Sequence, residues 1–196
     1  MDLKKRAKAQ AEEMLRDKYI ESEKAGTDLG DRRMVQWTRE YGEAWSVGYN
    51  LAHLMDLGDG RKPVYFAIFL DDASRKALVD AMLPLVPNGW KMFCHHCTLA
   101  FGDPGEAREV AMYIAKNLGK RIDLAVTRVG TSTDAIAVEV AGDIATRNEI
   151  PHITVAVPPD GKPVYSNRIR TWEDYDGHLT LSGVVDAFPS HFGWTH

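Results

Sequence analysis

The chain reads His95-His96-Cys97-Thr98-Leu99-Ala100-Phe101-Gly102 and, further on, Pro151-His152-Ile153-Thr154-Val155-Ala156-Val157. Both stretches place a His-x-Thr pattern inside a short run of apolar and β-branched residues, which favours a β-strand. Side chains two positions apart on a strand point to the same face. We therefore expect His96 beside Thr98, and His152 beside Thr154, each pair on a face that the most apolar residues leave open.

The first motif lies in a longer predicted strand, residues 90–101. Strict alternation puts one set of side chains on the open face: Cys94, His96, Thr98 and Ala100. The opposite face is more apolar and is expected against the core: Phe93, His95, Cys97, Leu99 and Phe101. In the second motif, the residues expected against the core are Ile153, Val155 and Val157.

Strands and helices are interleaved along the rest of this region. The strands expected outside the motifs are residues 64–70, 122–129, 135–140 and 179–185. Helices are expected to begin near Asp72, which can cap one, and near Pro104. This order, with a hairpin among the strands, predicts an α+β fold with largely antiparallel sheets.

The N-terminal part differs in composition. We expect residues 1–62 to form a helical extension and residues 63–196 to form the domain that carries the motifs. Residues 1–25 are rich in Lys, Glu, Ala and Gln, which predicts a solvated or partly disordered helix. Aromatic residues then recur at helical spacing, at Trp37, Tyr41 and Trp45, which predicts an amphipathic helix that packs in a core.

The composition restricts the class of protein. A chain of 196 residues with 44% hydrophobic and 27% charged residues is ordinary for a soluble globular protein. Its formal net charge of -4 argues against non-specific binding to double-stranded DNA, which needs a surplus of Lys and Arg. No apolar run approaches the roughly 20 residues of a membrane span. Without a signal-peptide pattern, and with Cys94 and Cys97 the only cysteines, the expected location is the reducing cytoplasm.

Two imidazoles and two hydroxyls suit the opening of a phosphodiester. The reaction needs a base for the nucleophile and an acid for the leaving oxygen, and imidazoles with pKa values near ~6.5 can fill both roles. Threonine hydroxyls can donate hydrogen bonds to the non-bridging oxygens, where charge builds in the transition state. This set of side chains requires neither a metal nor another cofactor.

The paired motifs resemble those of the 2H phosphoesterase superfamily, over residues 64–186. That superfamily includes the cyclic phosphodiesterase domain of fungal tRNA ligases and phage enzymes that destroy cyclic-oligonucleotide signals. The stretch Lys162-Pro163-Val164-Tyr165-Ser166-Asn167 resembles the tRNA-ligase type in particular. The resemblance implies a bilobal fold, with two antiparallel sheets facing a central cleft and helices outside. It also implies four catalytic residues: His96, Thr98, His152 and Thr154.

Other residues are candidates for substrate binding. Ser166 and Asn167 follow the second motif closely and can bind phosphate or ribose. Arg147 precedes that motif and can pair with a phosphate oxygen. Three aromatic residues can stack a base, although packing is the more ordinary interpretation of each: Tyr165, Trp90 and Trp172.

We therefore expect a metal-independent hydrolase that opens a 2′,3′-cyclic phosphate on a nucleotide or an RNA end. Two alternatives stay open, namely cleavage of a cyclic oligonucleotide and a non-catalytic module that binds RNA or nucleotides. A zinc or redox role for Cys94-x-x-Cys97 is disfavoured, because structural zinc usually takes four ligands and the two strand positions point to opposite faces. By resemblance His152 is the expected base and His96 the acid, with the opposite assignment also open. The oligomeric state does not follow from the sequence.

Overall fold

The computed structural model describes residues 3–57 and 60–192. The α-helices are α1 (Leu3–Ala25), α2 (Gly30–His53), α3 (Asp72–Met82) and α4 (Arg108–Asn117). Short 3-10 helices are η1 (Leu83–Leu85), η2 (Pro104–Glu106) and η3 (Pro163–Arg168). The strands are β1 (Tyr65–Leu70), β2 (Lys91–Met92), β3 (His96–Phe101), β4 (Arg121–Thr131), β5 (Ile136–Ala141), β6 (His152–Val157), β7 (Thr171–Asp174) and β8 (Thr180–Phe188).

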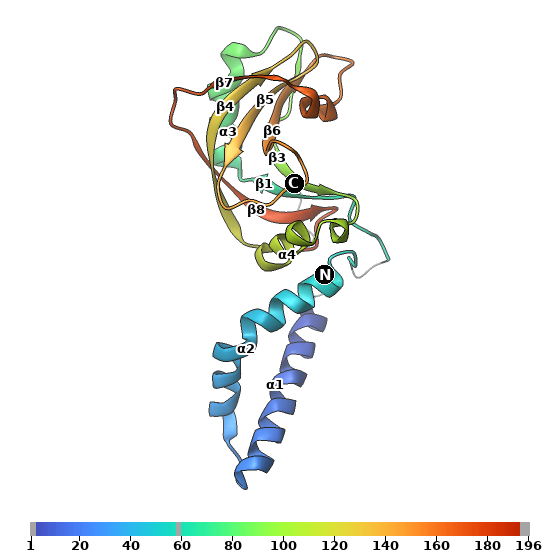
Figure 1. The fold of residues 1–196 in the computed structure, drawn as a ribbon, viewed down its shortest axis with the longest axis vertical. Helices are drawn as coiled ribbons and strands as arrows, with labels where there is room; N and C mark the ends of the chain where they lie inside the picture. The colour runs from blue at the N-terminus through green and yellow to red at the C-terminus, as the bar shows by residue number, and fades with distance from the viewer. Residues whose placement is uncertain (1–2, 58–59, 193–196) are drawn as a thin grey trace.

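The strands form one antiparallel sheet that closes on itself (Figure 1). Neighbours follow the order β6-β3-β1-β8-β4-β5, and β5 pairs with β6 to complete the ring, while β2 pairs with β6 and β7 with β4. The α+β class and the antiparallel pairing are thus confirmed.

The long strand β4 explains why the sheet is continuous. Residues 121–125 pair with β8, and residues 125–131 pair with β5. One half, made of β3, β1 and β8, therefore shares β4 with a second half made of β5, β6 and β2. The two halves are joined through β4 and through the β5–β6 pairing, so the closed sheet is not a clear match to two facing sheets, and the bilobal arrangement stays a prediction.

A large cluster of apolar side chains stabilises this arrangement. Ile68 of β1, Leu99 of β3 and Ile153 of β6 are fully buried in it. Leu78 of α3 and Ile114 of α4 complete the cluster from the helices. Because burial contributes roughly 25 cal/mol per Å² of apolar surface, the core fixes the strands that carry both motifs.

The predicted strand over residues 90–101 is interrupted. Two strands, β2 and β3, replace it, and between them Cys94 has φ 55°, a conformation that is uncommon outside glycine. This turn shifts the alternation, so that Cys94 is buried whereas Phe93 and His95 are only partly buried. The predicted faces of these three residues were wrong for that reason. Phe101, expected against the core, is 71% exposed.

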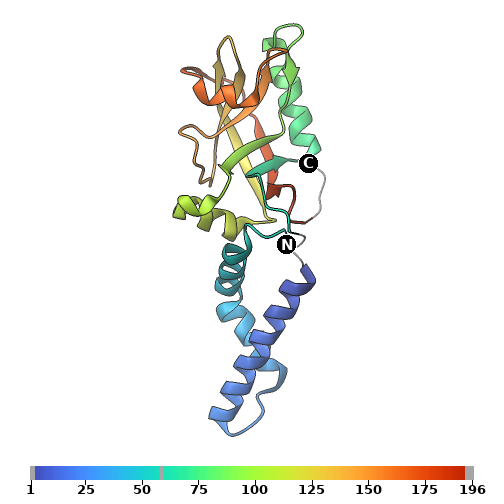
Figure 2. The same cartoon turned by 90° about the vertical axis from the view of Figure 1, so that its right-hand side faces the viewer.

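The helices α1 and α2 form a hairpin that projects from one end of the barrel (Figures 1 and 2). Nδ2 of Asn50 donates to the Ala115 carbonyl at 2.8 Å, which ties α2 to α4. Trp37 is buried as its spacing predicts, but Tyr41 is 49% exposed and lies outside the core. Within residues 3–57 and 60–192, no helix has both the length and the apolar character needed to cross a membrane.

Candidate active site

A cleft opens where β3 and β6 separate. Just before β3 the chain runs along β6, and the Phe93 amide donates to the Val155 carbonyl at 2.8 Å. Within β3 and β6, both described in full, Cys97 and Ile153 are the one pair in register. Beyond that pair β3 continues along β1, and β6 along β5. A cavity of about 700 Å³ lies beside this point of divergence.

The loop between β5 and β6 bonds to the edge of β3 that β6 leaves open. The Thr146 hydroxyl donates to the Thr98 carbonyl at 2.8 Å. The Arg147 amide donates to the Leu99 carbonyl, also at 2.8 Å. These bonds satisfy main-chain groups of β3 that would otherwise lack a strand partner, and they place the loop at the wall of the cleft.

Both motifs contribute side chains to this cleft. His96 and Thr98 reach it from β3, and His152 and Thr154 reach it from β6. His152 is 6% exposed, and the other three side chains are partly buried. One cavity therefore holds two imidazoles and two hydroxyls that come from strands far apart in the sequence.

His152 is hydrogen-bonded at both ring nitrogens. Nδ1 lies 2.8 Å from the Ile150 carbonyl oxygen and, because that oxygen can only accept, Nδ1 carries a hydrogen and donates it. Nε2 lies 2.9 Å from the Ser166 hydroxyl. Burial lowers the pKa of His152 by disfavouring the charged ring, and the bond to Ile150 partly opposes this effect. The neutral ring is therefore favoured near pH 7, with Nε2 as its basic atom.

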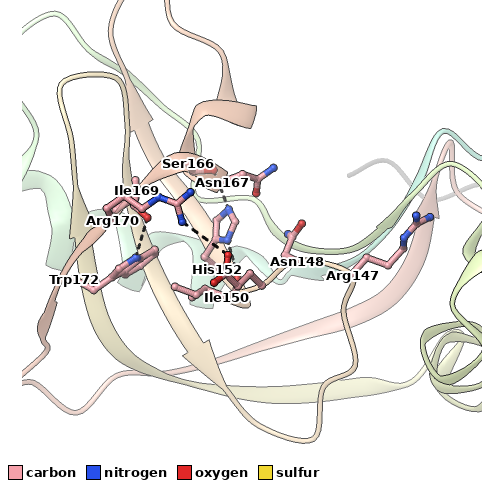
Figure 3. A pocket seen from close by; sticks show the side chains of 10 residues that line it. Arg147, Asn148, Ile150, His152, Ser166, Asn167, Ile169, Arg170 and Trp172 are labelled. Atoms are coloured by element: carbon pink, nitrogen blue, oxygen red, sulfur yellow. Dashed lines mark hydrogen bonds and ion pairs between the residues drawn. The ribbon is translucent and has the colours of Figure 1, made fainter.

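Ser166 connects the two polar residues of β6. Its Oγ lies 2.9 Å from Nε2 of His152 and 2.9 Å from Oγ1 of Thr154. The same hydroxyl is placed to donate to the Pro163 carbonyl at 2.7 Å. Ser166 is 3% exposed on η3, and Figure 3 shows the His152 ring pointing towards it. Ser166 thus lies in the cleft, bonded to two of the four motif side chains.

Aromatic rings surround His96. Tyr65 stacks on its imidazole with ring centroids 5.1 Å apart, and Phe69 lies at 5.4 Å. The register explains both contacts, since Phe69 faces His96 across β1 and β3 and Tyr65 points to the same side as Phe69. Phe188 in turn stacks on Tyr65 at 5.4 Å. These rings restrict the rotation of the His96 side chain.

Two of the other predicted binding residues, Arg147 and Asn167, line the cleft. The Arg147 guanidinium, however, donates to the Glu106 carboxylate at 2.7 Å, and in Figure 3 it points away from His152. Asn167 is exposed. Arg147 therefore already has an anionic partner that a substrate phosphate would have to displace.

Trp90 and Tyr165 are not among the described residues that line the cleft. Trp90 packs against the main core, and Tyr165 packs against a smaller cluster that includes Ile169. Their assignment to substrate binding stays a prediction. Trp172 lies closer to the motifs, with its ring 6.4 Å from that of His152 in the pocket shown in Figure 3.

Part of the cleft wall comes from residues that the sequence patterns did not predict there. Tyr65, Phe101 and His95 line the cleft, although they were either unassigned or expected against the core. The run of apolar residues at 64–70 hides which side chains of β1 face outwards. Tyr65 is the one residue of that run with a polar group, and its hydroxyl indicates that the strand face on which it lies is not fully buried.

Cys94 and Cys97 are free thiols in the core. Burial raises the pKa of Cys94 to about 11 and that of Cys97 to about 12. Both therefore stay protonated near pH 7, whereas metal binding and disulfide chemistry require the thiolate. Among residues 3–57 and 60–192, no three His, Cys, Asp or Glu side chains gather closely enough to hold a metal ion.

Comparison with known proteins leaves the family open. No protein-family model matches the chain, and no curated protein matches it. Among solved structures it is similar to one described as the crystal structure of a fungal RNA kinase, with 14% identity and a TM-score of 0.47. The match covers 64% of this chain and 45% of that chain, so this chain spans less than half the length of that structure. A likeness of this degree assigns neither a family nor an activity.

Proposed function

We propose that this protein is a metal-independent phosphodiesterase of the 2H type that hydrolyses a 2′,3′-cyclic phosphate on a nucleotide or an RNA end. The observation that carries the proposal is the shared cleft of His96, Thr98, His152 and Thr154. The proposal includes a two-lobed catalytic domain that begins at residue 63, with the N-terminal hairpin as an extension.

The two histidines divide the proton transfers. His152 takes a proton from water at Nε2, since its Nδ1 hydrogen is held by the Ile150 carbonyl. The water oxygen forms the new bond to phosphorus, and the leaving oxygen of the broken ester bond receives a proton from His96. Thr98 and Thr154 donate hydrogen bonds to the non-bridging oxygens as negative charge builds on them.

The dimensions of the cleft support a substrate of nucleotide size. Its volume of about 700 Å³ falls within the ~300–1,000 Å³ usual for small-molecule sites. Phe101, which is 71% exposed, supplies aromatic surface in its wall, beside the Tyr65 ring that is already stacked on His96 and Phe188, and aromatic faces accept any unpaired base. A nucleotide can thus place its phosphate between the motifs and its base against these rings.

A substrate panel with EDTA present tests the proposal. It contains 2′,3′-cyclic mononucleotides, RNA ending in a 2′,3′-cyclic phosphate, 2′,5′- and 3′,5′-linked oligomers, and cyclic dinucleotides. The unaltered protein is compared with His96→Ala and His152→Ala, and circular dichroism checks that each variant is folded. We expect opening of the cyclic phosphate by the unaltered protein and its loss in both variants.

Each other outcome changes the proposal in a defined way. Cleavage confined to cyclic dinucleotides would replace the substrate class with cyclic oligonucleotides. Binding of RNA or nucleotides without turnover would indicate a non-catalytic module. Loss of activity in EDTA, with recovery on addition of zinc, would overturn the metal-independent mechanism.

A further inference from the structure

The Ser166 hydroxyl has more hydrogen-bond partners than it has hydrogens. Its Oγ lies within 2.9 Å of both His152 Nε2 and Thr154 Oγ1, and 2.7 Å from the Pro163 carbonyl oxygen. The carbonyl can only accept, while His152 Nε2 accepts when the ring is neutral and donates when it is protonated. Thr154 can donate its own hydroxyl hydrogen to Ser166, which leaves the single hydrogen of Ser166 to point either at Nε2 or at the Pro163 carbonyl.

The charge of His152 determines that choice. When the ring is neutral, its Nε2 needs a donor, and the Ser166 hydroxyl supplies it. When the ring is protonated, Nε2–H donates to Ser166 Oγ, and the serine hydrogen turns to the Pro163 carbonyl. Both arrangements use the same heavy-atom distances, so His152 can change charge without any movement of its ring. With the neutral ring, the Pro163 carbonyl gives up the Ser166 hydrogen, and the Thr154 hydroxyl, 3.4 Å away, can donate to it instead.

We propose that Ser166 is a positioning residue for His152 and Thr154, holding the His152 ring in both of its charge states by reversing the direction of its own hydrogen bond. This inference rests on the proposed function, because it assigns Ser166 a role in proton transfer rather than in substrate binding. Ser166 is 3% exposed, so water competes little for these bonds. Because Ser166 Oγ faces the lone pair of Nε2, the proton from water reaches the ring through the serine, which gives its own hydrogen to Nε2 and takes one from water, so the serine exchanges no net proton in the cycle.

Other charged groups near His152 contribute to its titration and must stay constant in a test. Glu139 faces His152 across β5 and β6, but its carboxylate binds Arg128 of β4. Arg170 and Glu149 line the adjoining pocket, with their side chains 3.9 Å apart. The groups to leave unaltered are Glu139, Arg128, Arg147, Glu149, Arg170 and His96.

The titration of His152 gives the first test, because it needs no substrate. The protein is labelled with ¹⁵N, and the His152 ring signals are identified by their absence in His152→Ala. A bond from the protonated ring is charge-assisted and stronger than a bond to the neutral ring. Ser166→Ala should therefore lower the pKa of His152, by about 0.5–1 unit. An unchanged or raised pKa would overturn the proposal.

Turnover gives the second test, on the cyclic phosphate that the panel identifies. Ser166→Ala should lower kcat by about 10- to 100-fold with KM within about 3-fold. The acidic limb of the pH–rate profile, which reports the pKa of His152 as the base, should move to lower pH. Ser166→Thr keeps the hydroxyl and should restore most of kcat. Ser182→Ala is the matched control, because the Ser182 hydroxyl bonds to Asp123 away from the cleft. If Ser166→Ala does not fold, Ser166→Cys, with a weaker donor of similar size, takes its place.

Three results would contradict a positioning role. A higher kcat in Ser166→Ala would show that the serine blocks Nε2 rather than supporting it. A phosphorylated Ser166 detected by mass spectrometry during turnover would show that it is a nucleophile. If Ser166→Ala lowers both the free energy of unfolding and kcat while the pH–rate profile stays in place, the serine has a structural role only. If no substrate in the panel is turned over, the proposed function fails, and the ¹⁵N titration still decides whether Ser166 is coupled to His152.

Discussion

The rings of Tyr65 and His96 stack with their centroids 5.1 Å apart and their planes 26° from parallel. An aromatic pair contributes about 0.5–1.5 kcal/mol beyond the area it buries, and here that energy holds an imidazole in one orientation. Tyr65→Ala should therefore lower kcat on the cyclic phosphate by about 2- to 10-fold. Tyr65→Phe keeps the ring and should behave as the unaltered protein. Steady-state kinetics of both variants check this, and equal losses would point to the hydroxyl instead.

Removal of either motif histidine should lower kcat far more than Tyr65→Ala does. A positioned acid or base contributes about 10²–10⁴ in rate, so His96→Ala and His152→Ala should each lower kcat by that factor. A nitrophenyl ester, whose leaving group needs no proton, separates the roles. It should restore activity to His96→Ala and not to His152→Ala. The reverse pattern would exchange acid and base, and near-normal activity in both variants would remove the two-histidine mechanism.

The threonines should have smaller effects than the histidines. Each supplies one hydrogen bond to a charged oxygen, about 1.5–3 kcal/mol, so Thr98→Ala and Thr154→Ala should lower kcat/KM by roughly 10- to 150-fold. Thr98→Ser and Thr154→Ser keep the donor and serve as matched variants. A loss in the serine variants as large as that in the alanine variants would assign the effect to the methyl group.

Stability should fall in acid because of a histidine outside the cleft. Burial lowers the pKa of His191, which lies near Phe66, to about 4, whereas an unfolded chain has a value near ~6.5. The unfolded state therefore binds a proton first as the pH falls. The free energy of unfolding should therefore fall by about 3 kcal/mol as the pH is lowered from about 6.5 to 4, and this effect is absent above that range. Urea unfolding across this range should show a shallower pH dependence in His191→Asn, and parallel curves would refute the assignment.

Asn50 should contribute stability without contributing to catalysis. The Ala115 carbonyl that it binds lies in the last turn of α4, and the Gly119 amide that could otherwise satisfy it bonds instead to Val185. Asn50→Ala leaves a buried carbonyl unpaired and should cost about 1–3 kcal/mol in unfolding free energy. Gln36→Ala, on the exposed face of α2, is the control. Since the described residues lining the cleft all lie between Tyr65 and Asn167, kcat should be unchanged in both.

Alternation along a strand was sufficient to predict part of the site. The rule that residues two apart share a face put His96 with Thr98 and His152 with Thr154, and both pairs line the cleft. The same rule failed at Cys94, because a single residue with positive φ reverses the faces before it. Nothing in the local sequence, which has no glycine at that position, marks the turn.

Tertiary contacts account for the rest of what the sequence did not reveal. Ser166 was a candidate for binding substrate, but its bonds to His152 and Thr154 depend on where η3 folds back over β6. The closed sheet depends on β4 pairing with two strands in succession, whereas its sequence predicts only one hairpin. Pairings of this kind are set by packing across the whole domain and leave little trace in a local pattern.

The loop that borders β3 shapes the wall of the cleft without being one of the strands that form the barrel. Thr146 and Arg147 hold this wall through two bonds to main-chain carbonyls, in a place where a continuous sheet would have had a strand. Loops accept insertions and deletions that strands do not. Changes in the length of residues 142–151 can therefore retune which substrates fit while leaving the barrel and its paired motifs intact, so substrate range can evolve in this segment independently of folding.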